Sequence, residues 1–244
     1  MAVGCIANFI KKLGTFKLSD DHMRFFRGHT SCEYNLNPTI FRTENNHLVD
    51  KEDIIINELS AIYPELFDKC NSTLEKLVIA QHYGIPTRLL DITSNPLVAL
   101  YFACQKEKRK KKKEKIGNAI VYIFDIPKQN IKYSNDNDVV SFTDYLIFKK
   151  PTSNTKEIQE NQLCIKAKFI NPRMIKQNGA FILFKDRNDS KKIEIAKQID
   201  SIEIASNSIS RIQQELRTLC ISDATLFPEL SRFAEELKKG NINL

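Results

Sequence analysis

Residues 72–103 carry the densest structural signals in the chain, and they constrain its fold more than any other stretch. The Ser72–Glu75 step is a capping box that opens a helix, and Gly84 ends that helix. The Asn95–Pro96 dipeptide is the N-cap and first-turn signature of a second helix. The intervening residues predict a turn, a short strand and another turn. The stretch therefore predicts a helix, a strand and a helix in direct succession.

Hydrophobic patterns outside this stretch predict further elements. Apolar residues at helical spacing predict a helix over residues 50–67 and a short one around residues 6–13. Apolar or alternating runs predict strands over residues 23–27, 119–126, 163–170, 180–184 and 193–204. Ser206 or Ser208 caps a late helix, and a last helix follows over residues 231–239. Residues 127–160 show no clear period and are expected to form a long excursion.

Together these elements predict a single α+β domain. Helices lie mainly in its N-terminal half, and both halves contribute to a mixed sheet. We expect a leader segment over residues 1–20 and one domain over residues 21–240, with a basic loop inserted at 106–115. The sequence shows neither an internal repeat nor a Gly/Ser linker that would divide the domain.

Composition excludes several classes of protein. The chain has 244 residues, of which 42% are hydrophobic and 27% charged, as is usual for a globular protein. Its 7 glycines build neither GxGxxG nor GxxxxGK[ST], so Rossmann and P-loop phosphate sites are not supported. The histidines and cysteines form no metal-binding pattern, and the six widely spaced cysteines are expected to be free thiols. No apolar stretch approaches membrane-spanning length, so we expect a cytoplasmic protein without membrane contact or metal.

The net charge of +7 comes mostly from one segment. The run KEKRKKKKEK over residues 106–115 carries six of the seven net positive charges. Such a run is either a solvated surface loop or an electrostatic handle for a phosphate backbone or an acidic partner. On the second interpretation, the nucleic-acid-binding candidates are Arg109, Lys110, Lys111, Lys112 and Lys113.

Several separated segments resemble the FRG-domain family, which is named for a Phe/Tyr-Arg-Gly step near its start. They are FFRGHT (25–30) with LNPTIFR (36–42), AQHYGIPTRLLDITSNPLVALYFA (80–103), NPRMIKQNGAF (171–181) and the tail ISDATLFPEL (221–230). Their order and spacing extend the resemblance over about residues 24 to 235.

FRG domains in turn are similar to the NAD-dependent ADP-ribosyltransferases. The resemblance implies an ADP-ribosyltransferase-like sheet, NAD as substrate, and a toxin or defence effector that is controlled by an antitoxin or another regulatory protein. Arg27–Gly28 matches the first element of that superfamily, Thr93–Ser94 the second, and the strand after Gln177 the third. The sequence departs from the superfamily at the third element, where the usual Glu is missing. Asp91 and Glu160 are the candidates for the missing carboxylate.

The resemblance also implies residue roles, each with an alternative in the fold itself. The candidates for catalysis are Gln177, Asp91 and Thr93, and those for holding NAD are Arg27, Gly28, His29, Ser94, Tyr83 and His82. Arg27 has the planar fork that phosphates require, or it forms an ion pair or a carbonyl clamp inside the fold. The other candidates also have structural alternatives. Asp91 pairs with Arg88 to lock a turn, and Thr93 and Ser94 cap the following helix. His82 lies in the core or at a helix C-cap, and Gln177 is an amide at a strand edge.

The leading hypothesis is transfer of ADP-ribose from NAD to a macromolecular acceptor. The basic run favours nucleic acid, and RNA in particular, as that acceptor. NAD hydrolysis and a catalytically silent NAD- or nucleic-acid-binding module are the alternatives. On any of these readings, we expect Arg27, Asp91, Thr93 and Gln177 to converge on one cleft.

Overall fold

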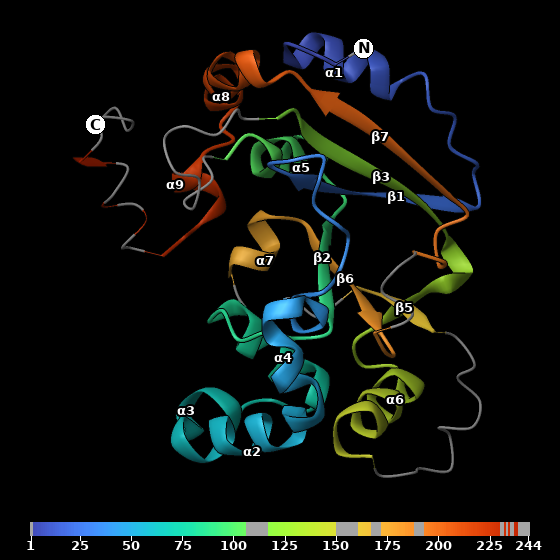
Figure 1. Cartoon of the computed structure of the whole chain (residues 1–244), viewed down its shortest axis with the longest axis vertical. Coiled ribbons are helices and arrows are strands. Elements are labelled where there is room, and N and C mark those ends of the chain that lie inside the picture. Colours follow the sequence, from blue (N-terminus) through green and yellow to red (C-terminus); the bar gives the residue numbers. More distant parts are fainter. Residues whose placement is uncertain are drawn as a thin grey trace.

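The computed structural model describes residues 2–105, 117–149, 161–166, 172–187 and 193–229, together with residues 232, 234, 237 and 238. These residues form an α+β fold around a seven-stranded sheet with the strand order β4-β5-β6-β2-β1-β3-β7 (Figure 1). Paired strands are antiparallel except for the parallel pair β4 and β5, so the sheet is mixed. The strands are β1 (His22–His29), β2 (Leu89–Thr93), β3 (Ala119–Pro127), β4 (Ile131–Tyr133), β5 (Gln162–Lys166), β6 (Gly179–Phe184) and β7 (Gln198–Ile204). The expected fold class is confirmed.

The described α-helices cover much of this sheet. They are α1 (Ile6–Leu13), α2 (Glu52–Ile62), α3 (Pro64–Phe67), α4 (Thr73–His82), α5 (Pro96–Ala103), α6 (Asn137–Phe148), α7 (Pro172–Lys176), α8 (Ile209–Thr218) and α9 (Asp223–Leu226). Shorter 3-10 segments are η1 (Thr39–Phe41), η2 (Thr43–Lys51), η3 (Lys128–Asn130) and η5 (Ser206–Ser208). None of the helices among the described residues is long and apolar enough to cross a membrane.

Helices α4 and α5, whose starts carry capping motifs, form as the sequence predicts. The Ser72 hydroxyl accepts a hydrogen bond from the Glu75 amide at 3.2 Å and so caps α4. The Glu75 carboxylate accepts from the amide of Asn71, one residue before the expected position. The Asn95 side chain accepts from the Leu97 amide at 2.9 Å and caps α5. One cap therefore fixes the start of the helix before β2, and the other fixes the start of the helix after β2.

Three expectations from the sequence are corrected. The predicted helix over residues 50–67 is divided at Tyr63, because the residue before a proline is disfavoured in helical conformation. Residues 127–160 are not a featureless excursion, since β4 and α6 lie within them. The last strand begins at Gln198 rather than at residue 193. Residues 167–170 of a further predicted strand and most of the predicted last helix lie outside the described residues.

The sheet divides into two parts between β1 and β2. These strands pair only at Phe26 with Thr93, whereas β1 and β3 stay in register from His22–Pro127 to His29–Ile120. Figure 1 shows β1, β3 and β7 running across one end of the molecule, with β2, β6 and β5 below them at a steep angle. Because the two strands separate on either side of one pairing point, polar groups near that point are open to side chains and ligands.

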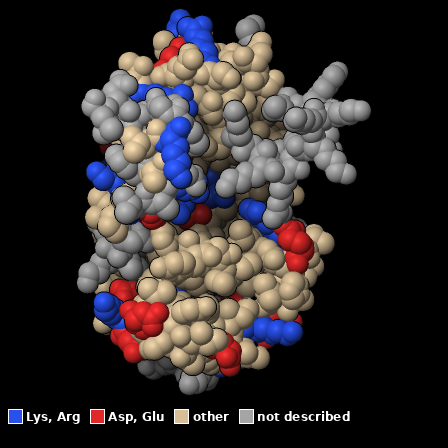
Figure 2. Space-filling model, turned by 90° about the vertical axis from the view of Figure 1, so that its left-hand side faces the viewer, with Lys and Arg blue, Asp and Glu red and all other residues tan. Residues whose placement is uncertain are grey.

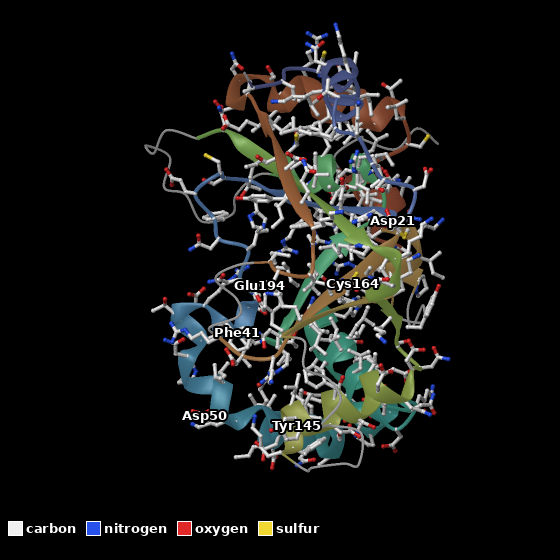
Figure 3. The ribbon with its side chains drawn as sticks, turned by 90° about the vertical axis from the view of Figure 1, so that its right-hand side faces the viewer. Asp21, Phe41, Asp50, Tyr145, Cys164 and Glu194 are labelled. Atoms are coloured by element: carbon white, nitrogen blue, oxygen red, sulfur yellow. The ribbon has the colours of Figure 1, made fainter. Side chains whose placement is uncertain are left out.

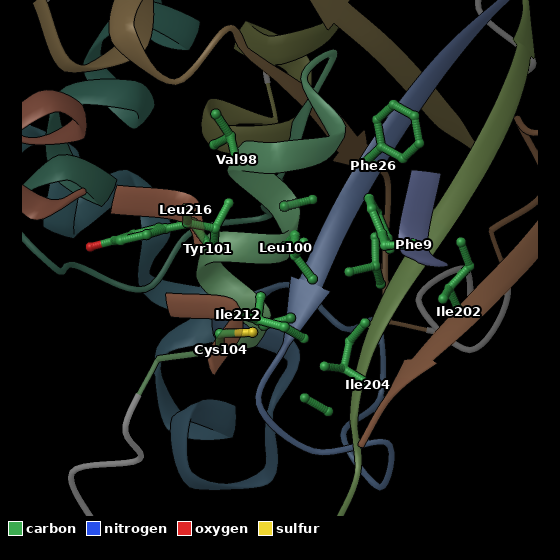
Figure 4. Packing of buried hydrophobic residues seen from close by; sticks show 14 of the residues in the cluster. Phe9, Phe26, Val98, Leu100, Tyr101, Cys104, Ile202, Ile204, Ile212 and Leu216 are labelled. Carbon is green, nitrogen blue, oxygen red and sulfur yellow. The ribbon is translucent and has the colours of Figure 1, made fainter. Parts of the chain in front are cut away.

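Apolar side chains pack on both faces of the sheet. One core joins α1, α5 and α8 to β1, β3 and β7, with Phe9 and Phe26 among its members (Figure 4). A second joins α2, α4 and α6 to β2, β5 and β6. A third covers the opposite face and includes Phe41 and Cys164, both labelled in Figure 3. Within the expected leader segment, Phe9 is fully buried and Val3 forms a bridge with Ile204.

Gly28 lies inside β1, directly against the backbone of α5. The first strand does not stop at this residue but continues through His29. A Cβ at Gly28 would lie 1.9 Å from the Ala99 carbonyl oxygen. The absence of a side chain therefore allows the backbone of α5 to approach β1 closely, next to the position of Arg27.

Candidate functional site

A cavity of about 1290 Å³ opens where β1 and β2 separate. Strands β1, β2 and β6, the ends of α4 and α7, one face of α5 and the segment that leads into η2 line it. On the face shown in Figure 2, Lys and Arg atoms gather with Asp and Glu atoms at a hollow across the middle of the molecule. Four of the predicted site residues, Arg27, Asp91, Thr93 and Gln177, line this one cavity as expected.

Arg27 joins the two separated strands through its guanidinium group. Its Nη1 donates to the Asp91 carbonyl oxygen at 2.5 Å, and its Nε donates to Nε2 of His29 at 2.9 Å. The carbonyl clamp considered from the sequence is therefore present. Among the described residues, Nη2 makes no hydrogen bond. Burial lowers the pKa of Arg27, Asp91 raises it and Arg42 lowers it further, yet an arginine remains charged at every physiological pH.

Asp91 faces the cavity and does not pair with Arg88. Its side chain is 64% exposed, its Oδ2 lies 3.7 Å from Nη1 of Arg27, and its Oδ1 accepts from Gln81 at 2.7 Å. Residues three apart along extended chain point to opposite faces, and the Arg88 guanidinium lies over the Phe41 ring on the other face. The alternative of an Arg88–Asp91 pair is therefore wrong: Arg88 pairs with Glu52 instead.

His29 is a neutral, buried member of the site. Burial, then the charges of Arg27 and Arg42, lower its pKa from 6.5 to about 3. Because its Nε2 accepts from Arg27, the ring proton must lie on Nδ1. That Nδ1 is buried and, within the part of the chain that the structure describes, has no hydrogen-bond partner. The ring packs edge-on against Tyr122 and Tyr34, which hold it beside the cavity.

We expect His29 to make the protein less stable in mild acid. An unfolded chain binds a proton at His29 below pH 6.5, whereas the folded protein does so only near its lowered pKa of about 3. Stability is therefore lost as the pH falls from 6.5 toward 3, and the loss between pH 7.5 and 5 is about 2 kcal/mol. His29→Gln keeps an acceptor for Arg27 but does not titrate. Urea denaturation at both pH values should show a pH dependence smaller by about that amount; an unchanged dependence would contradict the assignment.

Thr93, Ser94 and Gln177 hold two chain segments together at the cavity wall. The Thr93 hydroxyl donates to the Gln177 carbonyl oxygen at 2.6 Å and accepts from the Asn95 amide at 3.1 Å. The Ser94 amide donates to the carbonyl of Asn178 at 3.1 Å. The Gln177 side chain donates to the Leu226 carbonyl at 3.2 Å. Ser94 is not among the residues that line the cavity, and the N-cap of α5 is Asn95 rather than Thr93 or Ser94.

The end of α4 contributes His82 to the cavity but not Tyr83. His82 lies 3.9 Å from the Glu229 carboxylate, and burial followed by the charge of Arg173 lowers its pKa, while Glu229 raises it. Tyr83 is exposed, packs edge-on against His82 and lies outside the cavity lining. Gly28 does line the cavity, together with Arg27 and His29.

Three arginines of the cavity, Arg42, Arg173 and Arg187, were missed in the sequence. Arg42 ends the segment LNPTIFR, and Arg173 lies within NPRMIKQNG. Both segments had been singled out for their resemblance to a family, so an arginine in each was a usable signal. With Arg27 they make the lining rich in guanidinium groups, which suits an anionic ligand.

Some predicted residues cannot be placed in this site. The basic run with Arg109, Lys110, Lys111, Lys112 and Lys113 lies outside the described residues, and so does Glu160. Among the residues that the structure does describe, no cluster of three or more His, Cys, Asp or Glu side chains could hold a metal ion.

Comparison with known proteins identifies part of the chain. Residues 22–112 match the FRG domain family. The FRG match contains β1, β2, α4 and α5, and so includes Arg27, His29, Asp91 and Thr93. It ends before α7 and Gln177, which also contribute to the lining of the cavity. Searches of the curated proteins and of the solved structures gave no match.

Proposed function

We propose that the cavity binds NAD and that the protein transfers the ADP-ribose of NAD to a macromolecular acceptor. The observation that carries this proposal is the arrangement of charge in the cavity. Arg27 and Arg173 both line it, and the Asp91 carboxylate lies within electrostatic reach of each. A dinucleotide diphosphate needs guanidinium groups, and a ribose that becomes positively charged during transfer needs a carboxylate.

The proposed reaction breaks the bond between ribose C1′ and the nicotinamide nitrogen. Both electrons of that bond leave with nicotinamide, and C1′ passes through an oxocarbenium-like state. A nucleophilic atom of the acceptor then forms the new bond to C1′ and gives up its proton to a base. In this proposal Asp91 stabilises the positive ribose and accepts that proton, Thr93 and Gln177 shape the ribose pocket, and Arg27 with His29 contacts the diphosphate.

The acceptor and the biological setting rest on sequence rather than on the cavity. The basic run over residues 106–115 favours nucleic acid, and RNA in particular, as the acceptor. The resemblance to the ADP-ribosyltransferases favours a toxin or anti-phage defence effector in the cytoplasm, held in check by an antitoxin.

One observation favours a second candidate, a catalytically silent module that binds NAD or nucleic acid. The Gln177 amide is already bonded to the carbonyl of Leu226, and no carboxylate takes its place in the third element of the motif. NAD hydrolysis, with water as acceptor, is the third candidate and would use the same cavity. These functions differ in their products, so product analysis separates them.

The deciding experiment incubates the protein with NAD labelled in its adenine ring, together with RNA, DNA or protein. Label in RNA supports the leading proposal, and label in another polymer redirects the acceptor. Nicotinamide released without labelled polymer supports hydrolysis. Binding of NAD without turnover supports the silent module and overturns the proposed transfer.

Asp91→Asn should reduce the rate of nicotinamide release about 10²- to 10³-fold, because it removes the negative charge but keeps the shape. Asp68→Asn is the matched control, since Asp68 is exposed and lies outside the cavity lining. Thermal denaturation of both variants checks that the fold is kept. An Asp91→Asn variant with full activity would remove Asp91 from the reaction.

A further inference from the structure

Arg173 is a cation of the cavity that is supported by an aromatic ring. It lies on α7, lines the cavity, and places its guanidinium carbon 4.6 Å from the ring centroid of Phe227. Phe227 is only 8% exposed and is fixed against Tyr101 and Phe102 by ring contacts. The aromatic face thus acts as a rigid support for the guanidinium plane.

The edge of this guanidinium group is free to bind. The Arg173 carbonyl accepts from the Gln177 amide at 3.0 Å, but among the described residues the Arg173 side chain takes part in no hydrogen bond and no ion pair within 4 Å. Burial lowers the pKa of Arg173, the more distant carboxylates of Glu229 and Asp91 raise it, and the charge of Arg232 lowers it. Stacking uses the face of an arginine and leaves its N–H groups pointing outward from the edge, in the fork that fits two oxygens of a phosphate.

The segment Leu226–Glu229 holds this wall of the cavity in position. Leu226 accepts from the Gln177 side chain, Phe227 stacks with Arg173, and Glu229 lies 3.9 Å from His82. Three side chains that line the cavity are therefore set by one short segment. This segment begins at the last residue of α9 and lies far along the chain from the part that matches the FRG domain.

We propose that Arg173 is a ligand-binding residue that takes phosphate oxygens in the cavity, and that Phe227 is its positioning residue. The choice of NAD as the ligand rests on the proposed function, but the chemistry applies to any ligand with a diphosphate group. Arg27 spends two of its donor groups on Asp91 and His29. Arg173 keeps all of its donors for the ligand, and it therefore contributes more to affinity for phosphate.

Two arginines on the same aromatic ring provide a matched test. The guanidinium carbon of Arg232 lies 5.3 Å from the Phe227 centroid, but Arg232 is not among the residues that line the cavity. Arg173→Gln should raise the Kd for NAD and for inorganic pyrophosphate roughly ten- to a hundredfold, as expected for loss of charge-assisted hydrogen bonds. Arg232→Gln should leave both values within about twofold of the wild-type values. Calorimetric titration at one fixed salt concentration measures both ligands.

The role of Phe227 needs variants that separate position from stability. Phe227→Leu keeps an apolar side chain but removes the aromatic support, and it should weaken binding of both ligands. Phe227→Tyr keeps the ring and should restore affinity. A merely structural role predicts instead that affinity follows the melting temperature of each variant, and that result would remove Phe227 as a positioning residue.

The outcomes distinguish this proposal from the proposed function. Equal affinities of Arg173→Gln and Arg232→Gln, in a protein that binds NAD, overturn the role of Arg173 and leave the NAD proposal intact. Arg173-dependent binding of pyrophosphate without any binding of NAD supports the phosphate subsite and overturns NAD as the substrate.

Discussion

Gly28→Ala should lower the free energy of unfolding by at least about 3 kcal/mol, or prevent folding altogether. The added Cβ would lie 1.9 Å from the Ala99 carbonyl oxygen and 2.6 Å from the Ala103 amide nitrogen. Both atoms belong to the backbone of α5, so neither can turn aside as the end of a side chain could. The helix would have to move away from β1, which would open the core around Phe26.

Gly117 provides the matched control for this prediction. Its Cβ would have nothing within 4 Å, and Gly117→Ala should change stability by less than about 0.5 kcal/mol. Urea denaturation followed by circular dichroism compares the two variants. If Gly28→Ala had the same denaturation midpoint as Gly117→Ala, the close approach of α5 to β1 would be wrong. The glycine of the FRG step would then need a functional rather than a structural explanation.

Short-range signals in the sequence correctly predicted the starts of α4 and α5. The caps of α4 and α5 form because Ser72 and Asn95 reach amides only two or three residues away, and such short-range bonds are visible in sequence. Helix α6 was missed although Val139, Phe142 and Leu146 recur at helical spacing and are buried. The surrounding polar residues obscured this period, so the error lay in interpretation rather than in a missing signal.

The partners within the site could not be predicted in the same way. Arg27 bonds to the carbonyl of Asp91 because β1 and β2 separate next to Phe26, and no local pattern encodes that separation. Arg173 meets Phe227 only through the packing of α7 against the tail of the chain. Motif resemblance correctly brought Arg27, Asp91, Thr93 and Gln177 to one cavity. It did not reveal which of their polar groups are already engaged within the fold.

Arg88→Met should cost about 3–5 kcal/mol of stability, because it leaves Glu52 buried without its cation. Arg88 and Glu52 are 3% and 5% exposed, and they form two parallel contacts, one of them between Nε and Oε1 at 3.0 Å. Arg88 also donates to the carbonyl oxygens of Phe184 and Lys185, at 3.3 and 2.5 Å. The pair thus ties the start of α2 to the strands β2 and β6.

The double variant Glu52→Met/Arg88→Met separates the cost of a lone charge from the value of the pair. Replacing both partners removes the uncompensated carboxylate, so the double variant should be more stable than Arg88→Met alone. It should not reach wild-type stability, because the carbonyls of Phe184 and Lys185 lose their donor. Urea denaturation of the wild type, both single variants and the double variant closes the cycle. Additive losses would mean that Glu52 and Arg88 do not interact, and the site would then lack the ion pair that fixes the chain just before Asp91.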